Sequence, residues 1–199
     1  MLPQVRKETL SFLWPIDWLG LHREYLQAGE MEIIAALLRE VNAKSMIEIG
    51  CRDGRTARVL LHNVSSLERY VGIDVPMHYR PALPHQRNEM VAEPGHFAVA
   101  DPRFELLISD NGSRDLTWDK VGPVDAMFID GDHSFEVVLS DSHLADEVVK
   151  PGGIVIWHDY VNHAVDVTRA LEHLRDDEGW PIVNVAGTWL AFMWIPQAA

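Results

Sequence analysis

The chain has 199 residues, 47% of them hydrophobic and 24% charged, which fits one globular domain with a substantial core. No apolar run approaches the roughly 20 residues of a membrane-spanning helix, so the composition argues against a membrane protein. The formal net charge of −13, with no basic cluster beyond Arg6 and Lys7, argues against a nucleic-acid partner.

The same features predict a cytoplasmic protein that acts on a small molecule. Cys51 is the only cysteine, so no internal disulfide can form, as in proteins of a reducing compartment. Residues 1–8 lack the charged and then apolar pattern of an export signal. The sequence leaves a homo-oligomer open.

The first part of the chain alternates between helical and strand patterns. A leader at residues 1–29 bears tryptophan and proline, and apolar residues at helical spacing then predict a helix over 30–41. A short apolar run predicts a strand over 45–49, followed by a helix over 55–61 and a strand over 70–73. This alternation is typical of parallel sheets in which helices connect the strands.

Residues 75–97 interrupt the alternation. They contain four prolines and three histidines but few periodic apolar positions. Segments of this length without periodicity are usually functional or mobile. Because the segment follows a predicted strand, at the carboxyl edge of the sheet where ligands bind, we expect an inserted lid over a substrate. The irregular spacing of its histidines argues against a zinc site.

The second part resumes the alternation with three predicted strands and two predicted helices. The strands cover 104–108, 124–129 and 154–157, and the helices cover 134–149 and 165–175. The tail adds two strand patterns, 181–185 and 188–195, which two residues separate, as in a hairpin. The whole order predicts an α/β fold, a doubly wound parallel sheet that ends in an antiparallel pair.

A loop with two glycines lies between the first predicted strand and its helix. Gly50 lets the chain turn tightly beside a ligand, and Gly54 lets the helix pack close to the strand. Cys51 between them is expected to be a small buried residue rather than a nucleophile. Asp74 ends the next strand, where a carboxylate can accept hydrogen bonds from both hydroxyls of a ribose.

This loop also limits the kind of nucleotide that it can bind. It lacks the glycine pattern that binds a pyrophosphate, and it lacks the lysine of a P-loop. The expected ligand therefore has a ribose but no phosphate chain, a description that S-adenosylmethionine fits.

Ionisable residues follow two neighbouring predicted strands. Asp130, Asp132 and His133 come directly after one strand, and His158 with Asp159 comes after the next. Because ligands bind at the carboxyl ends of parallel strands, we expect one site that both strands share. Asp132 is also placed to cap the helix that follows.

Five segments resemble class I S-adenosylmethionine-dependent methyltransferases, namely 46–54, 70–74, 112–116, 125–136 and 151–160. The block Ile-Asp-Gly-Asp-His-Ser, followed by Pro-Gly-Gly and then His-Asp, is similar to a small-molecule O-methyltransferase branch that includes macrolide-sugar and cephalosporin-pathway enzymes. The resemblance covers about residues 30–195. It implies a Rossmann-like, doubly wound sheet of seven strands, mostly parallel with an antiparallel C-terminal strand, in a methyltransferase domain at 30–199.

The resemblance also assigns cofactor-binding residues by matching position. They form a pocket for the methionine part of the cofactor, a contact to its ribose and contacts to its adenine. These positions are Glu48, Gly50 and Gly54 for the methionine part, Asp74 for the ribose, and Ser113 and Arg114 for the adenine, with Cys51 and Asp130 as further cofactor contacts.

Metal-using members of the branch ligate the ion with residues that end two strands, and a histidine serves as the base. The matching positions are Asp130, His158 and Asp159 for the metal and His133 for the base, which makes Asp130, His133 and Asp159 the candidate catalytic residues. The departure is His158, where these relatives carry a carboxylate. Since Mg²⁺ prefers oxygen ligands, three alternatives stay open: another ion such as Mn²⁺, a His158 that is not a ligand, or no metal.

The implied function is O-methylation of a hydroxyl on a sugar or natural product, with S-adenosylmethionine as methyl donor. One alternative is a non-catalytic, methyltransferase-like binding module, which the intact Asp74, Asp130, His133 and Asp159 argue against. Another is a nicotinamide-dependent oxidoreductase on a similar fold, which the missing third glycine argues against. Asp141, on the helix after the His133 block, is expected to face solvent or to act as a structural partner.

Overall fold

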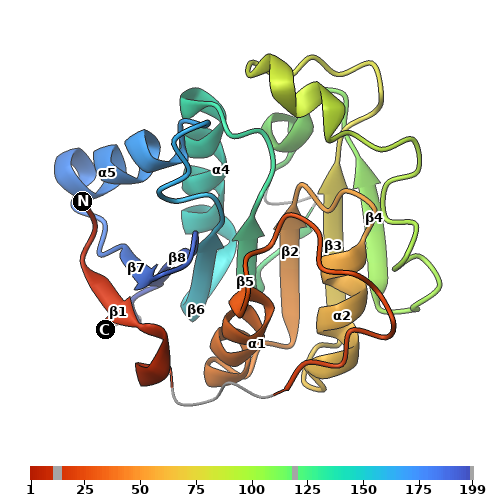
Figure 1. Cartoon of the computed structure of the whole chain (residues 1–199), viewed down its shortest axis with the longest axis horizontal. Coiled ribbons are helices and arrows are strands. Elements are labelled where there is room, and N and C mark those ends of the chain that lie inside the picture. The colour runs from red at the N-terminus through yellow and green to blue at the C-terminus, as the bar shows by residue number, and fades with distance from the viewer. Residues whose placement is uncertain (11–14, 118–120, 198–199) are drawn as a thin grey trace.

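The alternating pattern folds into one central sheet with helices on both faces (Figure 1). The computed structural model describes residues 1–10, 15–117 and 121–197. Within these ranges the sheet has eight strands, β1 (Gln4–Arg6), β2 (Ser45–Ile49), β3 (Arg69–Asp74), β4 (Phe104–Ile108), β5 (Val124–Ile129), β6 (Val149–Trp157), β7 (Val183–Ala186) and β8 (Ala191–Trp194).

Helices connect most of these strands. The α-helices of the described ranges are α1 (Glu30–Glu40), α2 (Arg55–Asn63), α4 (Phe135–Val148) and α5 (Val167–Glu178), and the 3₁₀ helices are η1 (Lys7–Thr9), η2 (Pro84–Asn88) and η3 (Gly112–Asp115). Among the described residues, no helix combines the length and the apolar character needed to cross a membrane.

The strand order, β1-β7-β8-β6-β5-β2-β3-β4, is that of a doubly wound sheet. From β2 the chain runs outward to β3 and β4 and then returns to β5 on the other side of β2. β8 is antiparallel to β6 and β7, whereas the other pairs of neighbours are parallel. This confirms the predicted Rossmann-like fold, and it places the switch in strand order, where such sheets bind ligands, between β2 and β5.

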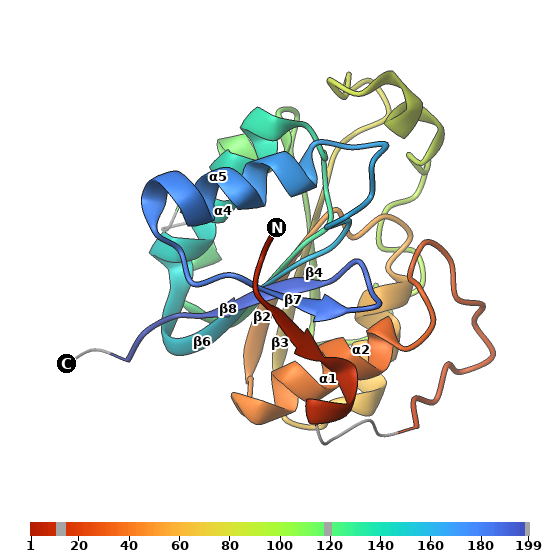
Figure 2. The same ribbon diagram turned by 60° about the vertical axis from the view of Figure 1, so that its left-hand side comes forward.

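The alternation of side chains along each strand divides the core into two layers. In β5, Met127 and Ile129 pack in the layer with α4 and α5, whereas Ala126 and Phe128 pack in the layer with α1 and α2. Figure 2 shows the two helix pairs on opposite sides of the sheet. Successive residues of a strand point to opposite faces, so burial on both faces explains why the strand sequences are apolar throughout.

The sequence predicts seven strands, and the eighth, β1, comes from the leader. β1 pairs in parallel with β7 at the edge of the sheet. Leu2, just before β1, is 3% exposed, and its backbone N–H donates to the Tyr160 hydroxyl at 2.8 Å. A strand of three residues is too short to show alternation, so its sequence gave no signal. Residues 11–14 of the predicted leader lie outside the described ranges.

The segment 75–97 runs over the carboxyl edge of the sheet after β3, where Figure 1 shows it in yellow and yellow-green. It contains the single 3₁₀ helix η2 of this stretch and is otherwise irregular. Proline at the first position of η2 suits a helix start, because its missing N–H would have no helical partner there. The segment therefore lies at the edge of the sheet where ligands bind.

We expect Leu2→Ala to lower the free energy of unfolding by about 2 kcal/mol or more, because it leaves a cavity under the first strand. Chemical denaturation followed by circular dichroism measures this change. Val99→Ala serves as the control, since Val99 is 57% exposed, and it should change stability by less than about 0.5 kcal/mol. Equal stability of the two variants would contradict the docking of β1.

Candidate active site

A cavity of about 390 Å³ opens at the carboxyl ends of the central strands. It is lined by the loops after β2, β3, β4, β5 and β6, by residues of α4, by the segment 75–97, by the leader around Tyr25, and by Trp189. A concave site of this volume at the switch in strand order is where a ligand of an open α/β sheet is expected. The predicted site residues can therefore be placed relative to one cavity.

The loop after β2 approaches the loop after β5 more closely than a side chain would allow. Gly50 has a φ of +85°, and a Cβ at this position would overlap the backbone carbonyl of Asp130. The Asp130 N–H in turn donates to the carbonyl of Ile49 at 2.9 Å. Gly54, with a φ of +82°, packs in the same way against the backbone of Gly95. Both predicted glycines thus serve close backbone approach at the cavity.

Asp74 lies at the end of β3, as predicted, and its side chain lines the cavity. Its carboxylate accepts hydrogen bonds from the backbone N–H groups of Arg52 at 2.5 Å and Val75 at 2.7 Å. Burial raises the pKa of Asp74, and the two N–H donors partly oppose this. Since each carboxylate oxygen has two lone pairs, both can still accept a hydroxyl donor.

Glu48 does not line the cavity and instead lies 2% exposed beneath the loop. The Tyr70 hydroxyl donates to its carboxylate at 2.9 Å. Burial raises the pKa of Glu48 to about 8, with the hydrogen bond from Tyr70 opposing. The structure therefore gives Glu48 a buried contact with Tyr70 of β3 and no place in the cavity lining.

The two residues predicted to flank an adenine differ in position. Ser113, in η3, lines the cavity and hydrogen-bonds through its hydroxyl to Asp141 of α4. Arg114 is not among the lining residues, and its guanidinium donates to Asn111 and, at 3.4 Å, to Tyr79.

Asp141 is only 1% exposed. Of the two predicted alternatives, it is therefore a structural partner and does not face solvent. Burial raises the pKa of Asp141 to about 7, against the opposing effect of its bond with Ser113.

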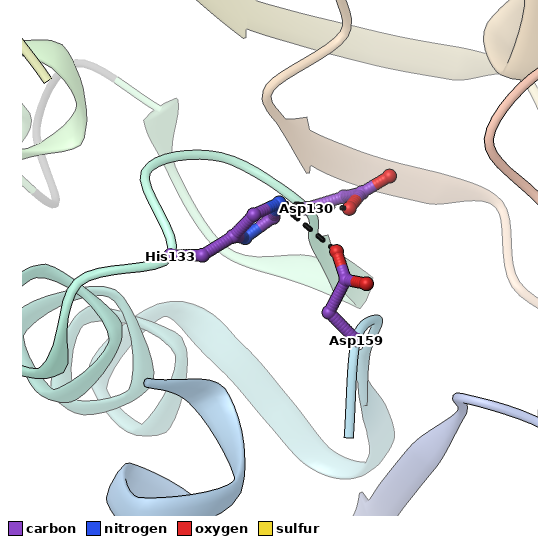
Figure 3. Close-up of side chains that lie close together, drawn as sticks. All are labelled: Asp130, His133 and Asp159. Atoms are coloured by element: carbon purple, nitrogen blue, oxygen red, sulfur yellow. Dashed lines mark ion pairs between the residues drawn. The ribbon is translucent and has the colours of Figure 1, made fainter. Parts of the chain in front are cut away.

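His133 pairs with the two aspartates that end β5 and β6. Its Nε2 lies 3.0 Å from Oδ2 of Asp159 and 3.8 Å from Oδ1 of Asp130, and Figure 3 shows the three side chains converging. Burial lowers the pKa of His133, but the hydrogen bond with Asp159 and the charge of Asp130 raise it above its ordinary value. Although burial opposes, the two imidazoles lower the pKa of Asp159 far below its usual range. Asp159 therefore fixes the His133 ring through Nε2.

His158 is also buried, and both of its ring nitrogens have partners. Nε2 lies 3.0 Å from Oε2 of Glu30, while Nδ1 lies 3.3 Å from Oδ1 of Asp130 and 3.4 Å from Oδ2 of Asp159. Burial opposes the charged form, but the three carboxylates raise the pKa of His158 well above its ordinary value. A protonated imidazole has no lone pair left for a metal ion.

A group that could hold a metal ion is present in the described ranges, and it contains His133 rather than His158. One ligand atom each of Asp130, His133 and Asp159 lies within 4.8 Å of the others. Two carboxylates and one imidazole suit Mn²⁺ better than Mg²⁺, which prefers oxygen ligands alone.

Glu30 is a site residue that the sequence reasoning missed. It lies in the first turn of α1 with 0% exposure, and it accepts hydrogen bonds from the backbone N–H groups of Gln27 and Trp189, each at 2.6 Å. An acid in the first turn of a helix is common because it complements the helix dipole. Nothing in its spacing pointed to His158, which is 128 residues away.

The leader is held against the glycine loop by two arginines. Glu24 accepts from Arg52 at 3.0 Å and from Arg55 at 3.1 Å. The Arg52 guanidinium lies 4.6 Å from the ring centroid of Tyr25, and its Nε donates to the carbonyl of Glu89 at 3.0 Å. Arg52 thus joins the loop to the leader and to the segment 75–97.

Comparison with known proteins identifies similar folds. A family model described as a methyltransferase domain matches residues 47–160, and no curated protein matches the chain. Cofactor-bound Rv0187 from MTB is 20% identical, with 90% of this chain and 85% of that chain covered and a TM-score of 0.62.

Two further solved structures are similar. One is the O-methyltransferase TomG from Streptomyces achromogenes, which is involved in tomaymycin synthesis and was solved in complex with SAM. It is 17% identical, with 90% of this chain and 85% of that chain covered and a TM-score of 0.58. The O-methyltransferase from Bacillus cereus, in complex with SAH, is 18% identical, with coverage of 90% and 86% and a TM-score of 0.56. At these identities the three likenesses show the fold.

Glu48 makes the stability dependent on pH. Between its ordinary pKa of 4.5 and its raised value of about 8, the folded state holds a proton that the unfolded state has lost, so its contribution to stability falls as the pH rises. As the pH rises from 5 to 8, we expect the free energy of unfolding of Glu48→Gln to increase by at least about 1 kcal/mol relative to that of the unsubstituted protein. Urea denaturation at several pH values measures this difference.

Glu68→Gln is the matched control, because the side chain of Glu68 is 72% exposed. It should leave the pH dependence of unfolding unchanged. An identical pH dependence for Glu48→Gln and the unsubstituted protein would contradict the buried, protonated carboxyl group.

Proposed function

Because the chain belongs to the family of methyltransferase domains, we propose that it transfers a methyl group from S-adenosylmethionine to a hydroxyl of a small molecule. The observation that carries this proposal is one cavity that joins the glycine loop and Asp74 to the His133–Asp159 pair. The solved structures in complex with SAM or SAH have the same fold and support the choice of methyl donor.

The cavity suits this methyl donor in shape and charge. The close backbone approach at Gly50 leaves room beside the loop, and Asp74 offers oxygens to the two ribose hydroxyls. Among the residues that line the cavity, carboxylates outnumber the arginines, and both arginines are paired with Glu24. A negative lining attracts a cation such as a sulfonium. Bound there, the donor would supply an electrophilic methyl group.

His133 is the residue that we assign as the general base. Methyl transfer needs an acceptor oxygen that is aligned with the methyl group and has lost its proton. Nδ1 of His133 would take that proton, because Nε2 donates to Asp159, which would hold the ring and stabilise the charged imidazole that results. The raised pKa of His133 makes it a stronger base than a free histidine.

A divalent ion is an alternative to this assignment, because the donor set fits one. Asp130, Asp159 and His133 would hold it, and it would lower the pKa of the acceptor hydroxyl. However, an ion bound at Nε2 of His133 would draw charge from the ring and leave a poor base. His158 already gives both aspartates a positive partner, and this favours catalysis by the base.

The acceptor that we infer is small and carries no negative charge. The carboxylates of the cavity would repel a phosphate or a carboxylate group, whereas a neutral or amino-bearing molecule with a hydroxyl suits them. Tyr25 and Leu26 of the leader and Met90 and Val91 of the segment 75–97 add apolar lining. The leader and the segment 75–97, which together cover the cavity, would therefore both contact the acceptor.

We expect the protein to bind S-adenosylhomocysteine at one site, and Asp74→Asn to weaken this binding about 10- to 100-fold through the lost charge-assisted hydrogen bonds. Calorimetric titration measures both affinities. Asp110→Asn is the control, because the side chain of Asp110 is 76% exposed on a nearby loop. Binding of NADH instead of S-adenosylhomocysteine would contradict the proposal and favour an oxidoreductase.

We expect His133→Gln to lower the rate of methyl transfer about 10²- to 10⁴-fold, because the acceptor keeps its proton. The rate is followed as formation of S-adenosylhomocysteine with a panel of hydroxylated acceptors. His96→Gln, at an exposed histidine, should keep the full rate. Activity should also survive treatment with a chelator. If the chelator instead abolishes activity and added Mn²⁺ restores it, Asp130, His133 and Asp159 would be assigned as metal ligands.

A further inference from the structure

One buried side chain of the segment 75–97 bonds directly to the backbone of the loop that carries His133. Gln86, in η2, is 6% exposed. Its Nε2 donates to the carbonyl of Gly131 at 3.0 Å, and its Oε1 accepts from the backbone N–H of His133 at 3.1 Å. One amide side chain therefore bonds to both peptide groups that flank Asp132.

These two bonds satisfy polar groups that the loop itself does not pair. Within the described ranges, neither the Gly131 carbonyl nor the His133 N–H makes a backbone hydrogen bond. A buried peptide group without a partner costs free energy, so Gln86 supplies what regular secondary structure supplies elsewhere. The loop keeps this conformation as long as Gln86 stays in place.

The backbone of His133 is thus held from two sides. Its carbonyl accepts from the N–H of Asp166, ahead of α5, at 3.1 Å, and its N–H donates to Gln86. The first contact comes from the main body of the fold, and the second comes from the segment 75–97. Among the hydrogen bonds of the described residues, the one to Gln86 is what links His133 directly to that segment.

A second contact joins the same two parts of the chain but does not touch His133. The Tyr79 hydroxyl donates to Oδ2 of Asp132 at 2.9 Å, while Oδ1 of Asp132 accepts from the N–H of Ser134 at 3.0 Å. Asp132 thus accepts a hydrogen bond from the N–H just ahead of α4, which is close to the capping role predicted for it. It also binds the segment through Tyr79. Tyr79 therefore fastens the segment to this loop through Asp132, whereas Gln86 holds the backbone of His133.

We propose that Gln86 is a positioning residue that couples the docking of the segment 75–97 to the placement of the base His133. This inference rests on the proposed function, in which His133 takes the acceptor proton. When the segment is docked, Gln86 holds the His133 backbone where Nε2 lies 3.0 Å from Asp159. When the segment is displaced, the N–H of His133 loses its partner and the ring loses its fixed place, so the base is complete only under the closed cover.

The test compares Gln86→Met with Arg87→Met, which places the same side chain one residue later in η2. Arg87 donates to the carbonyl of Tyr79 within the segment, so its loss disturbs the segment without touching the His133 loop. A third variant, Gln86→Glu, keeps an oxygen that can accept from the His133 N–H. Because it keeps a polar group of the same size at this position, it also provides a result for Gln86 if Gln86→Met does not fold.

The first measurement needs no acceptor. Amide hydrogen exchange and the ¹⁵N chemical shift of His133 Nε2 are recorded by NMR on the full chain, with and without S-adenosylhomocysteine. We expect the His133 amide to exchange at least about 10-fold faster in Gln86→Met, with a shifted Nε2 signal, and to stay protected in Gln86→Glu and Arg87→Met.

The second measurement uses the acceptor of highest rate from the hydroxylated panel. We expect kcat to fall about 10- to 100-fold in Gln86→Met, with KM for S-adenosylmethionine and the affinity for S-adenosylhomocysteine unchanged. Equal effects in Gln86→Met and Arg87→Met, or an unchanged His133 signal in Gln86→Met, would overturn the proposal. Failure of the unsubstituted protein to bind S-adenosylhomocysteine would instead refute the proposed function, and the exchange data would still decide the role of Gln86.

Discussion

The arrangement of the site depends on the close contact between the loops after β2 and β5. No side chain fits at position 50, because a Cβ would overlap the carbonyl of Asp130. This contact lies at the switch in strand order, where the chain leaves the centre of the sheet in both directions. It brings the loop that faces Asp74 beside the loop that carries His133. A cofactor site and a base can therefore share one cavity, although the two loops are separated by about 80 residues of sequence.

A second constraint is the balance of charge beneath that cavity. Two imidazoles lie among the carboxylates of Glu30, Asp130 and Asp159, and each imidazole is within about 3 Å of a carboxylate oxygen. Buried charges are costly unless they are paired and hydrogen-bonded, and here each has such a partner. His158 lies between Glu30 on one side and the two aspartates on the other, so both of its ring nitrogens have acidic partners. The same pairing leaves His133 with one close acidic partner, Asp159, as the proposed role of base requires.

The covers of the cavity are held by polar contacts to the loops beneath them. Glu24 and Tyr25 of the leader contact Arg52, and Gln86 and Tyr79 of the segment 75–97 contact the loop after β5. Such contacts cost less to break than a packed apolar interface, so they suit segments that must admit a ligand and then exclude water. The proposed chemistry and the proposed role of Gln86 both depend on these covers.

The sequence by itself determined the elements and the identity of the reactive groups. Apolar periodicity gave the strands and helices of the sheet, because burial on two faces requires it, and the residues after each strand were bound to gather at one edge. This sufficed to predict Gly50, Asp74, Asp130, His133 and Asp159 in one cavity. Only the tertiary structure decided that β1 joins the sheet, that Glu48 is buried against Tyr70, that Glu30 pairs with His158, and that Gln86 bonds to the backbone of His133. Those contacts are a short strand pairing and individual side-chain hydrogen bonds between different parts of the chain, and such isolated contacts leave no periodic pattern in a sequence.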